Sequence, residues 1–146
     1  MIFLQEPADF KARFDVAGCF CERGGKILLL LRHQNKPEGN TWGVPAGKVE
    51  KGESIHEAMA RELYEETGLL CESKNLNFIH SLFVRFPEYD LRYHVFRYAV
   101  LGDPAINLDA TAHTDFCWVT PAEALRMNLM RDEDSSIKLF YTLANG

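Results

Sequence analysis

The strongest constraint on the fold is one segment whose start, end and buried face are all encoded locally. Ser54 and Glu57 have the spacing of a capping box, in which each side chain accepts a hydrogen bond from the other residue's backbone amide. Gly68 supplies the left-handed conformation that ends a helix. The sequence therefore predicts a helix over about residues 55–67, and the rest of the chain must provide a surface for it.

The buried face of this helix also carries acids. At about 100° per residue, the apolar stripe is formed by Ile55, Ala58, Met59 and Leu63. Glu62 and Glu66 fall within that stripe, at about 340° and about 20° from Ile55. Glu65 flanks the stripe, whereas Arg61 is expected on the opposite side, away from the acids.

Such a face favours a metal site. Ionised carboxylates face a core only when they are paired or bind a metal. Three of them within one turn repel one another, and a divalent cation relieves that repulsion. Ligands that are all oxygen favour Mg²⁺ or Mn²⁺ over zinc. A solvated acidic surface is the alternative interpretation.

This helix and the loop before it together resemble a known sequence signature. Gly47, Glu53 and the run Arg-Glu-Leu-Tyr-Glu-Glu-Thr-Gly-Leu at 61–69 resemble a complete Nudix box, the signature of the Nudix hydrolase (MutT-like) superfamily. The resemblance implies hydrolysis of a nucleoside diphosphate linked to another moiety, with Mg²⁺ or Mn²⁺. It also implies Glu62 and Glu66 as principal metal ligands, joined by the Gly47 carbonyl, with Glu65 adjoining them.

The resemblance leaves the general base open. It implies that Arg61 orients an acidic partner, for which Glu53 and Glu65 are the candidates. Relatives often carry a further glutamate before the Trp-Val strand, where this chain has Ala112 and His113. His113, Glu53 and Glu65 are all candidate bases, and their rivals are Asp109, Asp115, Glu88 and Asp90.

The remaining pattern predicts a layered α/β (α+β) domain over residues 1–146, with a mixed central sheet and the α/β/α sandwich that the resemblance implies. Strands are expected at 14–21 and 26–32 around a Gly24-Gly25 turn, at 76–86 and 91–101 as antiparallel neighbours, and at 116–119. Residues 42–49 are expected to be extended but irregular. A helix should open at Thr120-Pro121, and a last one near Ser135, with Ile137, Phe140, Tyr141 and Ala144 on one face.

Substrate identity is only weakly encoded. Candidate phosphate ligands are Arg32, Lys48, Arg85, Arg92 and Arg97, and candidate stacking partners for a base are Trp42, Phe86, Tyr89 and Tyr93. We expect a nucleoside triphosphate or a related nucleotide. A nucleotide-sensing module without turnover and a prenyl-diphosphate isomerase are the alternatives, although neither Cys71 nor Cys117 is a compelling catalytic thiol.

The composition argues against two classes of binding partner. Of 146 residues, 16 are basic and 21 acidic, and a net charge of −5 argues against binding to a nucleic acid duplex or an anionic membrane. No signal peptide is recognisable, and the longest aliphatic run is only residues 27–31. The four cysteines are expected to be reduced thiols. We therefore expect a cytoplasmic protein, and a homodimer remains open.

Overall fold

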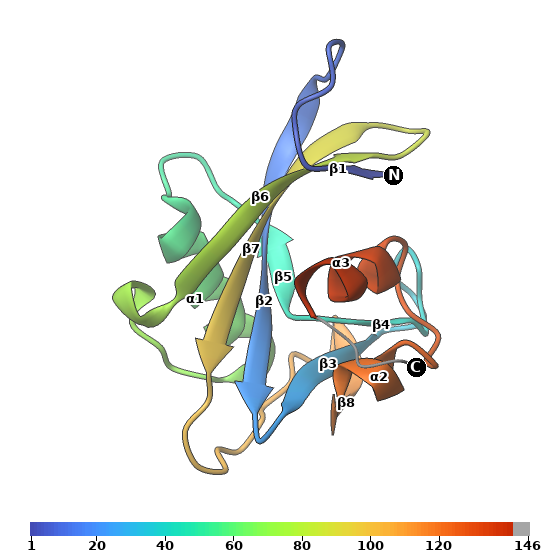
Figure 1. The fold of residues 1–146 in the computed structure, drawn as a ribbon. Coiled ribbons are helices and arrows are strands. Elements are labelled where there is room, and N and C mark those ends of the chain that lie inside the picture. Colours follow the sequence, from blue (N-terminus) through green and yellow to red (C-terminus); the bar gives the residue numbers. More distant parts are fainter. Residues whose placement is uncertain (142–146) are drawn as a thin grey trace.

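The computed structural model describes residues 1–141, which form a sheet flanked by helices (Figure 1). The strands are β1 (Ile2–Phe3), β2 (Ala12–Arg23), β3 (Lys26–Arg32), β4 (Trp42–Gly43), β5 (Ala46–Lys48), β6 (Asn77–Arg85), β7 (Asp90–Ala99) and β8 (His113–Val119). The helices are α1 (Ile55–Thr67), the 3₁₀ turn η1 (Ser73–Asn75), α2 (Pro121–Ala124) and α3 (Glu133–Phe140).

The sheet is mixed, as predicted. Within the described residues its strand order is β1-β6-β7-β2-β3-β4, with β5 also paired to β2 and β8 to β3. Strands β2 and β7 run parallel along most of their length, and the other pairs are antiparallel. Strands β2 and β7 form the centre of the molecule, because α1 packs on one of their faces and α3 on the other.

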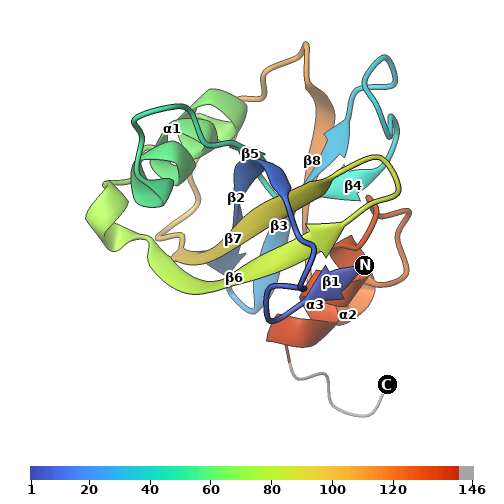
Figure 2. The same cartoon turned by 90° about the horizontal axis from the view of Figure 1, so that it is seen from above.

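Two apolar cores lie on opposite faces of this sheet. Helix α1 covers one face and helices α2 and α3 cover the other, as the two views show (Figures 1 and 2). Side chains alternate along β2, so Cys19 packs with Leu63 beneath α1, while Phe20 packs with Ile137 of α3. The predicted α/β/α sandwich is confirmed by this arrangement.

Local signals located several elements correctly. Helix α1 has the predicted bounds and capping box, and Gly68 ends it with a φ of 76°. Strands β6 and β7 pair antiparallel, as expected. Helix α2 has Pro121 at its start, and strand β8 begins at His113, three residues before the predicted position.

The predicted hairpin at Gly24-Gly25 is confirmed, with β2 and β3 paired antiparallel through Glu22↔Ile27 and Arg23↔Lys26. Two other expectations need correction. Residues 42–49 contain two regular strands, β4 and β5, since β2 and β3 offer them open edges.

The last helix starts at Glu133 rather than near Ser135, after Asp132 in a left-handed conformation. Tyr141 has already left this helix, and Ala144 lies outside the described residues.

Two further findings concern the thiols and the helices. All four cysteines are free; Cys19 and Cys21 are buried, and Cys71 and Cys117 are half-buried. Within residues 1–141, no helix has both the length and the apolar character that crossing a membrane requires.

We predict that Ser54→Ala lowers the free energy of unfolding by about 1 kcal/mol, because it removes the side-chain acceptor for the Glu57 amide. Urea denaturation of the two proteins measures this difference. The control is Ser135→Ala on the exposed side of α3, which should stay within about 0.5 kcal/mol of the parent. Equal losses in both variants would contradict the capping role.

Candidate active site

The acids of α1 differ sharply in burial. Glu66 is only 8% exposed, and its Oε1 accepts a 2.9 Å hydrogen bond from the Ala46 backbone amide. The Glu62 side chain is 14% exposed, whereas that of Glu65 is 53% exposed. The structure thus places Glu62 and Glu66 against the sheet and leaves Glu65 at the rim, as the helical spacing predicts.

Strand β5 brings its backbone directly against these carboxylates. A Cβ atom at Gly47 would overlap the Glu62 carboxylate, so only glycine fits this position without a shift. Gly47 is held there because it pairs with Ala17 of β2. The backbone of β5 and the carboxylates of Glu62 and Glu66 therefore pack against one another.

Burial destabilises the ionised forms of Glu62 and Glu66. Burial, followed by the nearby charge of Glu62, raises the pKa of Glu66 well above its ordinary value. Burial also raises the pKa of Glu62, although the hydrogen bond from Arg61 opposes that shift. A bound cation would stabilise both carboxylates in their ionised form.

Arg61 gathers the acids that surround it. Its Nε and Nη2 donate to the two oxygens of Glu53 at 2.7 and 2.9 Å. Its Nη1 donates to Glu62 at 2.8 Å and to Glu65 at 3.2 Å. The expectation that Arg61 lies away from the metal-side acids is therefore wrong, because the long guanidinium stem reaches around the helix.

The Arg61 contacts set the state of Glu53. The hydrogen bonds from Arg61, then that from the Glu50 amide, lower the pKa of Glu53 to about 2. Arg61 Nη2 also donates to the Lys48 carbonyl at 3.0 Å, which ties β5 to the helix. Glu53 is thus an acceptor that holds Arg61 in place, and it is a weak base.

The donor chemistry fits a hard divalent cation. The groups that lie along β5 are the carboxylates of Glu62 and Glu66 and the backbone of Gly47, with Glu65 at the rim, and the set contains no sulfur or imidazole. Within the described chain, no three His, Cys, Asp or Glu side chains already converge on one point as metal ligands. Arg61 shares its Nη1 between Glu62 and Glu65 instead.

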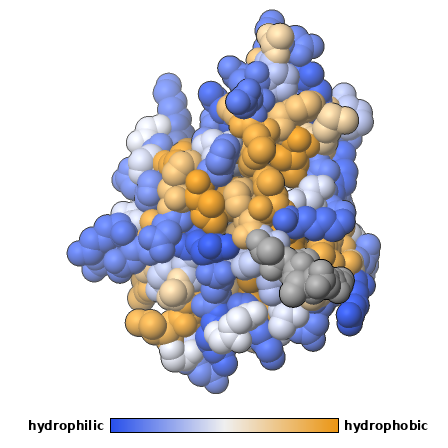
Figure 3. All heavy atoms as spheres, in the orientation of Figure 1, coloured by the Kyte–Doolittle hydropathy of each residue, from blue (hydrophilic) through white to orange (hydrophobic). Residues whose placement is uncertain are grey.

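A cavity of about 650 Å³ adjoins this cluster and is called here the α3 cavity. It extends from Ala46 and Gly47 across β2 and β7 to the start of α3, and its walls include Phe14, Val84 and Leu91. Apolar side chains gather on this face of the molecule (Figure 3). A nucleotide-sized space therefore touches the same two β5 residues that contact Glu62 and Glu66.

The structure places only some of the candidate substrate-binding residues at the α3 cavity. Arg32, Lys48, Phe86 and Tyr89 line the α3 cavity, together with Tyr93. The rings of Phe86 and Tyr89 meet edge to face, 5.7 Å apart. Trp42, Arg92 and Arg97 are not part of this lining, so the structure does not bring them to the site.

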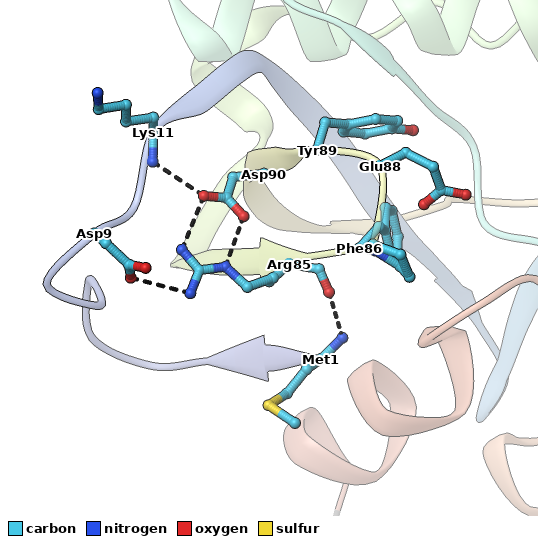
Figure 4. A pocket seen from close by; sticks show the side chains of 9 residues that line it. Met1, Asp9, Lys11, Arg85, Phe86, Glu88, Tyr89 and Asp90 are labelled. Carbon is cyan, nitrogen blue, oxygen red and sulfur yellow. Dashed lines mark hydrogen bonds and ion pairs between the residues drawn. The ribbon is translucent and has the colours of Figure 1, made fainter.

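Arg85 lies in a separate cavity of about 790 Å³ (Figure 4). There Asp90 accepts from Arg85 Nε and Nη2 at 2.8 and 3.0 Å, and Asp9 accepts from Nη1 at 3.1 Å. These two carboxylates neutralise the guanidinium, so Arg85 offers little attraction to a phosphate.

His113 is buried at the start of β8, opposite Arg32 of β3. Its Nδ1 has no hydrogen-bond partner among the described residues. Burial, then the positive charge of Arg32, lowers the pKa of His113 to about 4. The imidazole is therefore neutral near pH 7 and a weak base, and it does not line the α3 cavity.

Six polar residues of the α3 cavity were not predicted from the sequence, and Glu133 and Ser136 are the buried ones; the others are Arg13, Glu38, Arg131 and Asp132. Glu133 and Ser136 share the inward face of α3 with Ile137. The signal was that Glu133 falls on the same helix face as the buried Ile137, as Glu62 and Glu66 fall within the apolar stripe of α1. It was overlooked because the helix was expected to begin two residues after Glu133.

Comparisons with known proteins agree with this architecture. The family model for the NUDIX domain matches residues 11–140. The chain is 30% identical over 129 residues to CTP pyrophosphohydrolase of Escherichia coli (strain K12), covering 88% of this chain and 92% of that protein. It is 42% identical over 74 residues to ADP-ribose pyrophosphatase of Methanocaldococcus jannaschii, covering 51% of this chain but only 41% of that relative's length.

Among solved structures, the MutT NUDIX hydrolase from Burkholderia pseudomallei superposes with a TM-score of 0.75 at 21% identity, covering 88% of this chain and 98% of that one. This likeness concerns the fold alone. The family match over most of the chain, on a fold that packs the box glutamates against Gly47, shows that the chain belongs to the Nudix family.

Proposed function

We propose that this chain hydrolyses a phosphoanhydride bond in a nucleoside triphosphate or a related nucleotide, with Mg²⁺ or Mn²⁺ as cofactor. The observation that carries the proposal is the double role of Ala46 and Gly47. Both line the α3 cavity, and both contact a box glutamate, Glu66 and Glu62 respectively. The full-length likeness to a CTP pyrophosphohydrolase supports a triphosphate substrate.

The cation would be held by Glu62, Glu65, Glu66 and the Gly47 carbonyl. When bound, it would supply neutralisation of phosphate charge and a water of lowered pKa. Lys48 and Arg32 of the cavity wall would bind phosphate oxygens. Arg61 would act as a positioning residue, because it fixes Glu53 and the β5 carbonyl of Lys48 through charge-assisted hydrogen bonds.

The general base remains a proposal, and Glu65 is the preferred candidate. Its carboxylate is the most exposed of the box glutamates and accepts only one hydrogen bond among the described residues, from Arg61 at 3.2 Å. Glu53 is held ionised by Arg61 with a pKa of about 2, and His113 has a pKa of about 4. Both are therefore poorer proton acceptors near neutral pH.

No observation favours the prenyl-diphosphate isomerase considered above. Burial raises the pKa of Cys71 to about 11 and also raises that of Cys117, so neither is a ready thiolate. Neither lines the α3 cavity. A single domain over residues 1–146, a cytoplasmic location and a homodimer stay predictions.

We predict that turnover requires Mg²⁺ or Mn²⁺ and stops in EDTA, because the buried carboxylates would otherwise repel a polyphosphate. The measurement is chromatography of products from a panel of canonical and oxidised nucleoside triphosphates, ADP-ribose, nucleotide sugars and dinucleoside polyphosphates. Excess Mg²⁺ should restore the EDTA-treated protein. Undiminished turnover in chelator would rule out the metal role, and binding without turnover of any panel member would favour a sensing module.

We predict that Glu66→Gln lowers Mg²⁺-dependent turnover about 100-fold or more, a loss of roughly 2.7 kcal/mol in transition-state stabilisation. Glutamine keeps the acceptor for the Ala46 amide but removes the charge that a hard cation needs. Because burial raises the pKa of Glu66, removing its charge should leave the metal-free melting temperature unchanged or higher.

The matched control is Glu72→Gln, an exposed acid outside the site whose partner is Lys74. It should keep both turnover and melting temperature. A purely structural role for Glu66 predicts the opposite pattern in Glu66→Gln, namely a lower melting temperature with intact specific activity. That pattern would overturn the assignment of Glu66 as a metal ligand.

A further inference from the structure

Three polar side chains form a row across three neighbouring strands of the sheet. Ser81 lies on β6, His94 on β7 and Asp15 on β2, and these strands are adjacent (Figure 1). The Ser81 hydroxyl lies 2.7 Å from His94 Nδ1, and His94 Nε2 lies 2.9 Å from Asp15 Oδ1. A hydroxyl, an imidazole and a carboxylate are thus joined by consecutive hydrogen bonds.

The carboxylate decides how the imidazole is protonated. An ionised carboxylate only accepts hydrogen bonds, so His94 Nε2 carries the hydrogen that is donated to Asp15. In the neutral imidazole Nδ1 then has a free lone pair, and the Ser81 hydroxyl donates to it. Arg92 Nε lies 3.0 Å from the same Asp15 oxygen, which gives the carboxylate a cationic partner. The hydroxyl therefore stands beside a base that is oriented to take its proton.

The row shares a face of the sheet with the core beneath α1. Side chains alternate along a strand, so Asp15 points to the same side as Cys19, which packs beneath α1. His94 shares that side with Phe96 for the same reason. His94 is 9% exposed, whereas Ser81 is half-buried. The base is shielded from water, and the hydroxyl is more open than the base.

This row is not part of the proposed nucleotide site. Ser81, His94 and Asp15 line neither of the two cavities described above. The α3 cavity lies against the opposite face of β2, to which Phe14 points. A histidine this buried needs hydrogen-bond partners in any case, so a purely structural role is the alternative interpretation. The two interpretations differ in the hydroxyl, because only a nucleophile must react.

We propose that Ser81 is a nucleophile toward activated carboxylic esters, with His94 as its general base and Asp15 as the residue that orients the imidazole. The order of hydroxyl, imidazole and carboxylate activates a serine, which is otherwise a weak nucleophile. The site needs no metal ion, so it acts independently of the proposed nucleotide hydrolysis.

The reaction transfers an acyl group to the serine. Ser81 Oγ forms a bond to the ester carbonyl carbon while its proton passes to His94 Nδ1. The bond from that carbon to the alcohol oxygen breaks, and the oxygen leaves with the electron pair and takes the proton from His94. Asp15 stabilises the imidazolium that exists between the two proton transfers. The products are an acyl-serine and a free alcohol.

The test exposes the chain to p-nitrophenyl acetate in EDTA, stops the reaction with acid at several times, and locates acetyl groups by peptide mass spectrometry. Ser81 should be acetylated at least about 100-fold faster than Ser135, because a positioned general base contributes that much. Ser135 is the comparison within the same molecule, since it is exposed on α3. Exposure favours Ser135, so a faster reaction at Ser81 cannot come from access.

His94→Gln should slow the acetylation of Ser81 about 100-fold, since glutamine keeps hydrogen-bonding groups but takes up no proton. His80→Gln is the matched control, because His80 is exposed and its Nδ1 contacts the Ser81 carbonyl rather than the hydroxyl. It should keep the parent rate. Asp15→Asn should also slow the reaction, and it serves as the second variant if the melting temperature shows that His94→Gln does not fold.

Acetylation of Ser81 that is no faster than that of Ser135 would overturn the proposal without any variant. A rate at Ser81 that survives both His94→Gln and Asp15→Asn would also overturn it. Equal losses in His80→Gln and His94→Gln would do the same, because the rate would then not depend on the hydrogen bond at the hydroxyl.

Discussion

The close approach of β5 to α1 is the contact on which the site depends. Glu62 packs where a side chain on Gly47 would stand, and Glu66 accepts from the Ala46 amide. Both contacts require β5 to be fixed from its other side, which its pairing with β2 provides. A conventional buried face of α1 would be more stable in isolation, because burial opposes the charge on both acids. The helix keeps acids there at a cost in folding free energy that a cation offsets only in the bound state.

Arg61 limits that cost in the absence of a cation. Its guanidinium donates to Glu53, Glu62 and Glu65, so part of the negative charge has a positive partner within the same helix and its preceding loop. The interaction with Glu53 is bidentate and involves a side chain with little exposure, which makes it stronger than an ordinary surface pair. Arg61 thereby links the loop, the helix and the β5 carbonyl of Lys48 in one network.

The sequence predicted α1 well because all of its signals are local: a cap, a left-handed glycine and a repeating apolar stripe lie within about fifteen residues. It did not predict β4 and β5, since short strands exist only where a distant strand offers an edge, here β3 and β2. Arg61 was misplaced because a helical wheel fixes the direction of Cβ, whereas a long side chain ends well away from that direction. Glu133 was missed because the helix start was set too late, which removed the acid from the face being analysed.

The buried acids of α1 and α3 follow one physical rule. An acid on the apolar stripe of a helix needs a partner, and the kind of partner depends on what surrounds it. Burial, followed by the nearby charge of Glu62, raises the pKa of Glu66, and burial raises that of Glu62, so their shared requirement is a cation. Glu133 has an amide from Val44 and no second acid at hydrogen-bond distance, so a neutral donor suffices for its remaining oxygen. Because Glu133 and Glu66 accept from the amides of Val44 and Ala46, two residues apart, the hydrogen-bonded acid and the cation-requiring acids are held by one short segment of chain beside the α3 cavity.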